Sequence, residues 1–257
     1  MTYLDAVFLG LLQGLTEFLP VSSSGHLVLG QHLLGVKQPG VAFEVLVHLG
    51  TLASVVVYFR RRLWRLVKSL YTRELSEERR IIGLLIVGTV PAVLAGLFLE
   101  DFFERAFSDP LVTSIMLAVT GLILLSTRFV RKGERAPDLK SSLIMGIGQA
   151  LAIMPGISRS GTTISAGLLV GVRPSEAAEF SFLLAIPAIA GAALLEWRAL
   201  FNLGAELAGP YAVATLLSFA SGLLAVYAVL AVIRRGHFEY FAYYCFAAAA
   251  LGVYLFV

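Results

Sequence analysis

The sequence predicts an all-α polytopic membrane protein, on the basis of its composition, its apolar segments and a similarity between its two halves. Of the 257 residues, 58% are hydrophobic and 14% are charged, and the mean hydropathy is +0.84. An ordinary soluble domain carries roughly 25% charged and roughly 45–50% apolar residues. So few charges cannot cover the surface of a soluble fold of this length. The composition therefore excludes a soluble domain and a disordered chain.

Six apolar segments are long enough to cross a bilayer, which takes about 20 mostly apolar residues. These segments are residues 41–59, 80–99, 110–127, 177–196, 208–232 and 240–257. They predict six transmembrane helices.

Two further apolar regions, 2–35 and 141–172, are each interrupted by a polar stretch. The breaks fall at residues 20–26 and 155–162, and the segments on either side of each break are too short to span a bilayer. Non-helical backbone at membrane depth is tolerated only where it is buried in protein or lines a wet cavity. We therefore expect two re-entrant helix–loop–helix hairpins.

The two hairpins are related to each other in sequence. A shift of 136 residues aligns 10–38 with 146–174, and nine of the 29 aligned positions are identical. Matched Gln, Ser and Gly residues in register are harder to attribute to chance than matched apolar residues. We expect each half to hold one hairpin and three spans, with residues 1–135 as the first repeat and 136–257 as the second.

The charges of the loops predict their orientation. Residues 60–80 contain eight basic side chains and 128–140 contain five, whereas 100–109 contain four acidic side chains and one basic one. Because basic loops lie on the cytoplasmic side, we expect the acidic loop and both termini to be external. The hairpins then enter from opposite faces, which makes an inverted-topology repeat. Such repeats place a site near the midplane, where broken helices meet.

The remaining composition restricts the partners. The net charge of +3 is accounted for by the basic loops, and no basic recognition module is visible, so nucleic-acid binding is not expected. The single cysteine, Cys245, excludes a disulfide framework and a cysteine metal cluster. The glycine-rich stretch 83–96 permits close helix packing, which leaves a homodimer open.

An acidic residue inside the first hairpin is the first candidate for function. Glu17 follows Gln13 by four residues in an apolar helix, so both side chains share one helical face. A charged group at the bilayer centre costs about 2.5–3.5 kcal/mol, and it therefore faces a partner or a cavity. The alternative is a structural glutamate that is hydrogen-bonded to a neighbouring helix.

A histidine follows three serines in the first break. Ser22, Ser23 and Ser24 are of a residue type that often caps helix N-termini. A histidine that stands alone in an apolar segment is more often a core residue. Here His26 comes directly after a hydroxyl cluster, and we expect it to approach Glu17. A histidine that is oriented by a carboxylate beside a nucleophilic hydroxyl is an acid–base arrangement.

An arginine flanked by hydroxyls begins the second half of the other hairpin. Arg159 lies among Ser158, Ser160 and Thr163. Its rigid fork of donors suits phosphate oxygens, and a helix N-terminus adds affinity for an anion. The segment therefore predicts a phosphate cradle. The alternative, a structural salt bridge from Arg159 to Glu17, leaves the hydroxyls unexplained.

The two hairpins differ where chemistry would need them to differ. In the repeat alignment Ser23 faces Arg159, His26 faces Thr162, and no acid faces Glu17. An asymmetric catalytic site requires that division, whereas a symmetric gate does not. A transporter or lipid flippase is the competing class, because inverted repeats with broken helices are typical of transporters.

Two stretches resemble the paired motifs of the bacterial undecaprenyl-diphosphate phosphatases, the bacitracin-resistance family, namely Gln13–His26 and Pro155–Ser165. Supporting similarity includes Phe43–Val45 and Glu179–Leu184, and it covers essentially the whole chain. The resemblance implies a multi-pass enzyme of the bacterial cytoplasmic membrane. That enzyme would hydrolyse undecaprenyl diphosphate to undecaprenyl phosphate and inorganic phosphate, recycle the lipid carrier of cell-wall synthesis and confer bacitracin resistance. A divalent cation, Mg²⁺ or Ca²⁺, is also implied.

These residues fall into three expected groups. The catalytic group is Glu17, Ser23, His26 and Arg159. The substrate-binding group is Gln13, Ser22, Ser24, Ser158, Arg159, Ser160 and Thr163. The metal-binding group is Glu17 and Gln13.

Ser23 is the preferred nucleophile, with His26 as its acid–base partner, and attack by His26 itself or by water stays open. We expect the prenyl tail to lie between apolar helices and the head group to enter from the external face. His48 and Glu44, in the first expected span, could line the cavity, but the sequence favours packing or hydrogen-bonding roles for them.

Overall fold

Helices make up the fold, and no strand occurs in the part of the chain that the structure describes. The computed structural model describes residues 1–36, 41–72, 74–107, 109–130, 133–202 and 204–256. The α-helices of these residues are α1 (Tyr3–Phe18), α2 (Ser23–Leu34), α3 (Ala42–Tyr58), α4 (Arg60–Ser69), α5 (Ser76–Phe98), α6 (Glu100–Phe107), α7 (Pro110–Ser126), α8 (Leu139–Leu151), α9 (Arg159–Leu169), α10 (Pro174–Leu195), α11 (Ala205–Arg235) and α12 (Phe241–Phe256).

The structure contains five or six candidate spans, against the six that the sequence predicts. Among the described residues, the helices α5, α7, α10, α11 and α12 are each long and apolar enough to cross a membrane. A sixth span is formed if α3 and α4 count as one, although the chain bends by 76° between them. The prediction of a polytopic helical membrane protein is therefore confirmed.

The basic segment 60–80 contains more regular structure than the loop that the sequence predicts. It contains α4, which packs against the start of α5. Arg62 and Arg65 of α4 both pair with Glu78 of α5, and Arg62 Nε lies 2.8 Å from Glu179 Oε1 of α10. The basic segment is therefore anchored on two spans. The acidic segment also holds a short helix, α6.

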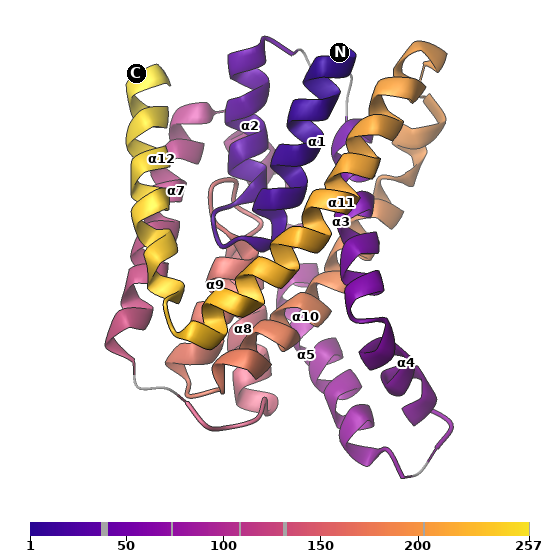
Figure 1. Cartoon of the computed structure of the whole chain (residues 1–257), viewed down its shortest axis with the longest axis vertical. Coiled ribbons are helices and arrows are strands. Elements are labelled where there is room, and N and C mark those ends of the chain that lie inside the picture. Colours follow the sequence, from indigo (N-terminus) through magenta and orange to yellow (C-terminus); the bar gives the residue numbers. More distant parts are fainter. Residues whose placement is uncertain (37–40, 73, 108, 131–132, 203, 257) are drawn as a thin grey trace.

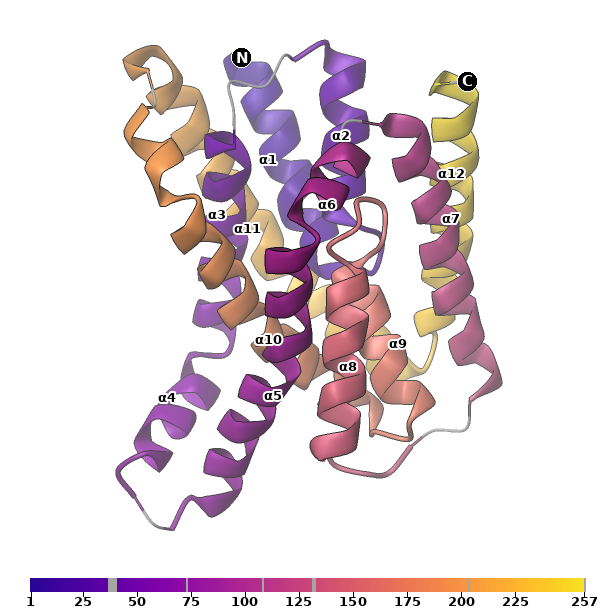
Figure 2. The same ribbon diagram turned by 180° about the vertical axis from the view of Figure 1, so that it is seen from behind.

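The two ends of the molecule carry different segments. Figure 1 shows both termini at one end and α4 at the opposite end. Figure 2 shows α6 toward the end with the termini, and the connection between α7 and α8 at the end with α4. The basic and acidic connections therefore lie at opposite ends, as the charge pattern predicts.

The two hairpins, α1–α2 and α8–α9, enter from opposite ends, and their turns meet in the middle of the molecule (Figure 2). The contact between the turns is close, because a Cβ on Gly25 would lie 3.1 Å from Cα of Gly156. The hydroxyl of Ser160 in α9 donates to the carbonyl of Leu19 in the first turn, at 3.2 Å. This arrangement is consistent with the expected inverted repeat.

The first break follows from its residue types. Leu19 precedes Pro20, which disfavours the helical region, and Leu19 is extended (φ −61°, ψ 140°). Ser22 then has φ 68°, the one positive φ of a non-glycine residue in the described chain. Its hydroxyl accepts from the backbone N–H of Gly25 at 3.3 Å and thereby caps α2.

The second break is built in a matching way. The hydroxyl of Ser158 caps α9 by accepting from the N–H of Gly161 at 3.1 Å. Thr120 of α7 holds the turn, because its Oγ1 accepts from Ser158 N at 3.0 Å and donates to Gly156 O at 2.8 Å. Thr120 thereby supplies partners within the protein for two backbone groups of this turn, as its depth requires.

The hairpins pack against spans of the other half. α1 lies along α11, and α8 lies along α5. A hydrophobic cluster beside the turns includes Phe18 at the end of α1 and Phe182 of α10, whose rings meet edge to face at 5.6 Å. This packing fixes the end of α1, where the candidate site lies.

Candidate active site

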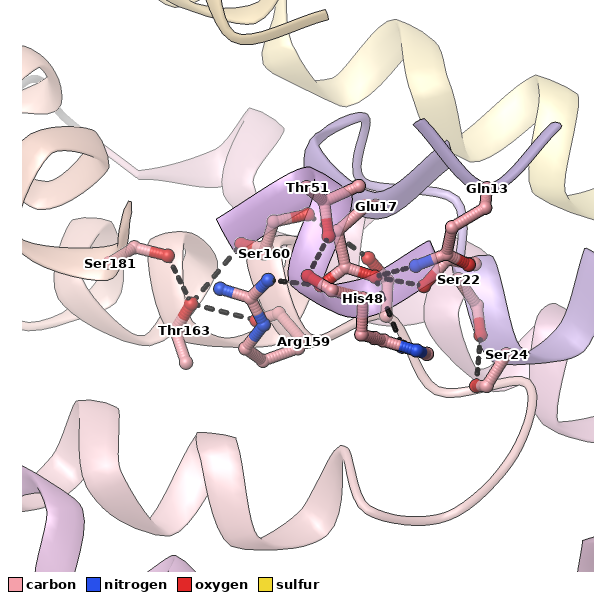
Figure 3. Close-up of polar contacts among 12 residues, drawn as sticks. Gln13, Glu17, Ser22, Ser24, His48, Thr51, Arg159, Ser160, Thr163 and Ser181 are labelled. Atoms are coloured by element: carbon pink, nitrogen blue, oxygen red, sulfur yellow. Dashed lines mark hydrogen bonds and ion pairs between the residues drawn. The ribbon is translucent and has the colours of Figure 1, made fainter. Parts of the chain in front are cut away.

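Glu17, in the last turn of α1, is the centre of the candidate site. Only 7% of the residue is exposed. Its Oε2 accepts from Gln13 Nε2 at 3.0 Å and from Ser23 Oγ at 2.5 Å, and its Oε1 accepts from Arg159 Nη2. Figure 3 shows the side chains of Gln13 and Arg159 turned toward the Glu17 carboxylate. The structure therefore brings one carboxylate, one hydroxyl and one guanidinium together.

Two helices begin at this point. Ser23 is the first residue of α2, and Arg159 is the first residue of α9. The first turn of a helix has N–H groups without intrahelical acceptors and a positive dipole end, so it attracts anions. Two helix N-termini and one guanidinium thus surround a single carboxylate, which leaves the site suited to a further anion.

The ion pair between Arg159 and Glu17 was the structural alternative for Arg159, and it is present. It does not use all the donors of the arginine. The side chain of Arg159 is 13% exposed, and its Nη1 is buried without a hydrogen-bond partner. Arg159 therefore keeps a free donor for an incoming oxygen while it holds Glu17.

The other serines of the two motifs make contacts within the protein. Ser22 and Ser158 are N-caps, and their hydroxyl oxygens lie 3.3 Å from those of Ser24 and Ser160 respectively. All of these residues lie in the two turns, next to the centre of the site. Their predicted contact with a substrate remains a prediction.

Thr163 lies one turn further along α9 than Arg159. Its hydroxyl donates to the Arg159 carbonyl at 2.7 Å and lies 2.6 Å from the hydroxyl of Ser181 in α10. Figure 3 shows Thr163 turned toward Ser181. Thr163 thus joins α9 to α10, and the structure does not bring its hydroxyl to Glu17.

His26 does not approach Glu17, and this expectation was wrong. Its Nδ1 bonds to the carbonyl of Ser22 at 2.8 Å, and its Nε2 bonds to the hydroxyl of Tyr244 at 2.7 Å. The two rings are nearly parallel, with centroids 5.6 Å apart. His26 follows Ser23 by three residues in α2, and its ring turns to α12 while the Ser23 hydroxyl turns to Glu17.

Comparison with known proteins places this chain in a family. A sequence model of the family described as bacitracin resistance protein BacA matches residues 6–251, which include the turns of both hairpins. The chain belongs to the BacA family. Relatives named undecaprenyl-diphosphatase support this membership. One from Syntrophotalea carbinolica is 48% identical over 95% of both chains, one from Rubrobacter xylanophilus is 49% identical over 96% of both, and one from Salinibacter ruber is 40% identical over 99% of this chain and all of the relative.

In this BacA family member, His48 lies at the site, although the sequence favoured a packing or hydrogen-bonding role for it. Its Nε2 lies 3.6 Å from Glu17 Oε2, and its Nδ1 bonds to the carbonyl of Glu44 at 2.7 Å. The available signal was a histidine within an apolar span, where an imidazole needs a polar neighbour. The sequence could not show which face of α3 turns toward α1.

The expected cation can be tested against these residues. The structure describes no group of three His, Cys, Asp or Glu side chains that could hold a metal ion. Gln13 nevertheless has a buried amide oxygen, Oε1, without a partner, and its amide nitrogen lies against the Glu17 carboxylate. One carboxylate and one free amide oxygen fit a hard cation that also binds substrate phosphates.

Proposed function

We propose that this membrane protein hydrolyses undecaprenyl diphosphate to undecaprenyl phosphate and inorganic phosphate. The activity named for its relatives supports this proposal. The observation that carries it is the convergence of Ser23, Glu17 and Arg159 where the two polar breaks meet. Through this reaction the protein would recycle the lipid carrier of cell-wall synthesis and confer bacitracin resistance.

Arg159 binds the diphosphate in this proposal. Its unpartnered Nη1 offers a donor, and the N-termini of α2 and α9 add positive potential. Phosphoryl transfer depends mainly on positioning and on the stabilisation of charge. The hydroxyls of Ser22, Ser24, Ser158 and Ser160 border the same turns, so small movements of the turns would make them available to phosphate oxygens.

Ser23 is the nucleophile that the geometry favours. Its Oγ attacks the terminal phosphorus while its proton passes to Glu17 Oε2, 2.5 Å away. The bond between that phosphorus and the bridging oxygen breaks, and the bridging oxygen takes the proton from Glu17 as undecaprenyl phosphate leaves. Water then attacks the phosphoserine, releases inorganic phosphate and returns a proton to Ser23. Glu17 thus takes the place that we had expected for His26 as the base.

His26 is a less suitable nucleophile in this arrangement, because both of its ring nitrogens are engaged. Its contacts with Ser22 and Tyr244 instead fix the start of α2, which carries Ser23. We propose that His26 positions the nucleophile.

A divalent cation, Mg²⁺ or Ca²⁺, would be held by Glu17 and Gln13 and would neutralise charge on the diphosphate when bound. The residues support this assignment through the carboxylate and the free amide oxygen described above.

We further propose that the protein lies in the bacterial cytoplasmic membrane, with the site open to the external face and the prenyl tail between apolar helices. The opposite placement of the basic and acidic connections supports this orientation. A homodimer is also possible on the exposed side of α5, where an added Cβ on Gly83 or Gly96 would meet nothing within 4 Å.

The direct test is phosphate release from undecaprenyl diphosphate by purified protein in detergent. Transport is impossible in detergent, so turnover there separates an enzyme from a pure flippase. We expect phosphate release with multiple turnovers, and rapid acid quenching should trap phosphate on Ser23. A protein that binds the lipid but releases no phosphate would contradict the proposal.

A further inference from the structure

His48 and Glu17 face each other in the site without a hydrogen bond between them. His48 Nδ1 lies 2.7 Å from the carbonyl of Glu44, and because a carbonyl can only accept, Nδ1 carries the hydrogen of the neutral ring. The lone pair is then on Nε2, which lies 3.6 Å from Glu17 Oε2. Two acceptors at this distance repel each other unless a positive charge lies between them.

A third acceptor lies at the same carboxylate. Gln13 donates its amide nitrogen to Glu17 Oε2, and its Oε1 is buried without a partner. The amide oxygen and nitrogen of a glutamine exchange places by a half-turn of the amide group. The site therefore contains an imidazole nitrogen, a carboxylate and an amide oxygen from α1 and α3.

The orientation of His48 is the one that metal-binding histidines have. A ligating imidazole usually donates its other N–H to a carbonyl or carboxylate, which fixes the ring and its tautomer. His48 has this arrangement with the carbonyl of Glu44, and 29% of its side chain is exposed. His26 differs, because its Nε2 is already bonded to Tyr244.

We propose that His48 is a ligand of the divalent cation, together with Glu17 and Gln13. This inference rests on the proposed function, which supplies the expectation of a cation, and it changes which ions the site prefers. Imidazole suits transition-metal ions, whereas Mg²⁺ and Ca²⁺ take oxygen ligands. A set of one nitrogen and two oxygen ligands therefore favours Mn²⁺ or Zn²⁺ over Ca²⁺.

The test is Mn²⁺ binding by the whole purified protein in detergent, without substrate, followed by electron paramagnetic resonance. Pulsed measurements should detect coupling of bound Mn²⁺ to a ¹⁴N nucleus. When the histidines of the unmodified protein are labelled with ¹⁵N, this signal should be replaced by coupling to a ¹⁵N nucleus. In His48→Gln we expect the coupling to disappear and the affinity to fall at least about tenfold. Absence of histidine coupling in the unmodified protein would overturn the proposal.

His32→Gln is the matched control. His32 also bonds through Nδ1 to the carbonyl one turn earlier, that of Val28, at 3.1 Å, but it belongs to α2 and packs on Phe256. This variant should bind Mn²⁺ as the unmodified protein does. Equal Mn²⁺ affinity and equal coupling in His48→Gln and His32→Gln would overturn the proposal.

Phosphate release by the same preparations separates this inference from the proposed function. If the unmodified protein hydrolyses undecaprenyl diphosphate but shows no nitrogen coupling, the proposed phosphatase activity stands and His48 is not a metal ligand. If the unmodified protein binds Mn²⁺ through nitrogen but releases no phosphate, the proposed phosphatase activity is wrong and the metal site stands.

Discussion

The two hairpins share a scaffold but carry different chemistry. α1 begins with a capping box between Thr2 and Asp5, and α8 begins with one between Asp138 and Ser141, exactly 136 residues later in each case. Both second helices are capped by a serine, and each hairpin ends on a glycine with positive φ. The local signals that start these helices are therefore alike in both halves.

The functional groups are not the same. The first hairpin has Glu17 and Ser23 at its break, and the second has Arg159 at the position of Ser23. Gln13 bonds to Glu17, whereas its counterpart Gln149 is buried with neither amide atom partnered. One hairpin supplies the carboxylate and the hydroxyl, and the other supplies the cation. Neither hairpin alone can form the site, so the chemistry depends on contact between the turns.

Removal of the nucleophile should have the largest effect. Ser23→Ala leaves no Oγ to attack phosphorus, and Glu17→Ala leaves no acceptor for its proton. We expect phosphate release to fall by about 10⁴-fold or more in either variant. Steady-state assays in detergent, with size-exclusion profiles to confirm folding, measure this loss. A trapped phospho-enzyme in Ser23→Ala would exclude Ser23 as the nucleophile.

Replacement of Arg159, which takes the position of Ser23 in the second hairpin, should have the next largest effect. Arg159→Ala removes the donor fork, and we expect a loss of about 10³-fold in phosphate release. Arg159→Lys keeps the charge without the fork and should recover only part of the activity. Near-normal turnover by Arg159→Ala would mean that the second hairpin contributes no binding group.

A smaller effect is expected from the contact that holds α2 to α12. Tyr244→Phe keeps the ring beside His26 but removes the hydroxyl bond to Nε2. Because one hydrogen bond contributes about 1 kcal/mol, we expect kcat to fall by no more than about tenfold. His26→Ala should cost much more, because it also removes the bond to Ser22. If Tyr244→Phe lost as much activity as His26→Ala, the tyrosine itself would act on the substrate.

The smallest effect concerns the cap of α8. The backbone N–H and the hydroxyl of Ser141 hold the pKa of Asp138 below its ordinary value. A lowered carboxyl pKa stabilises the fold above the unfolded pKa of about 3.9, and this contribution disappears as pH falls through the folded value. Asp138→Ala should cost about 1 kcal/mol at pH 7. Thermal unfolding at pH 7 and pH 3 should show a smaller difference between the variants at pH 3.

Sequence patterns gave good predictions for features that depend on neighbouring residues. The six spans, the two breaks and the residue pair Glu17 and Arg159 could all be located, because apolar length, proline and buried charge act locally. The helix α4 could not be separated from a loop, because its stability depends on pairing with Glu78 of α5 and Glu179 of α10. These residues adjoin α4 only after the spans have packed.

The sequence alone determined that this chain is a helical membrane protein with two broken hairpins, and it pointed to Glu17, Ser23 and Arg159, which the structure brings together. Only the tertiary structure decided their partners: Glu17 contacts His48 rather than His26, and His26 contacts Tyr244. The physical reason is rotation about the helix axis. Spacing along a helix shows which residues share a face, but packing against distant helices decides where that face turns.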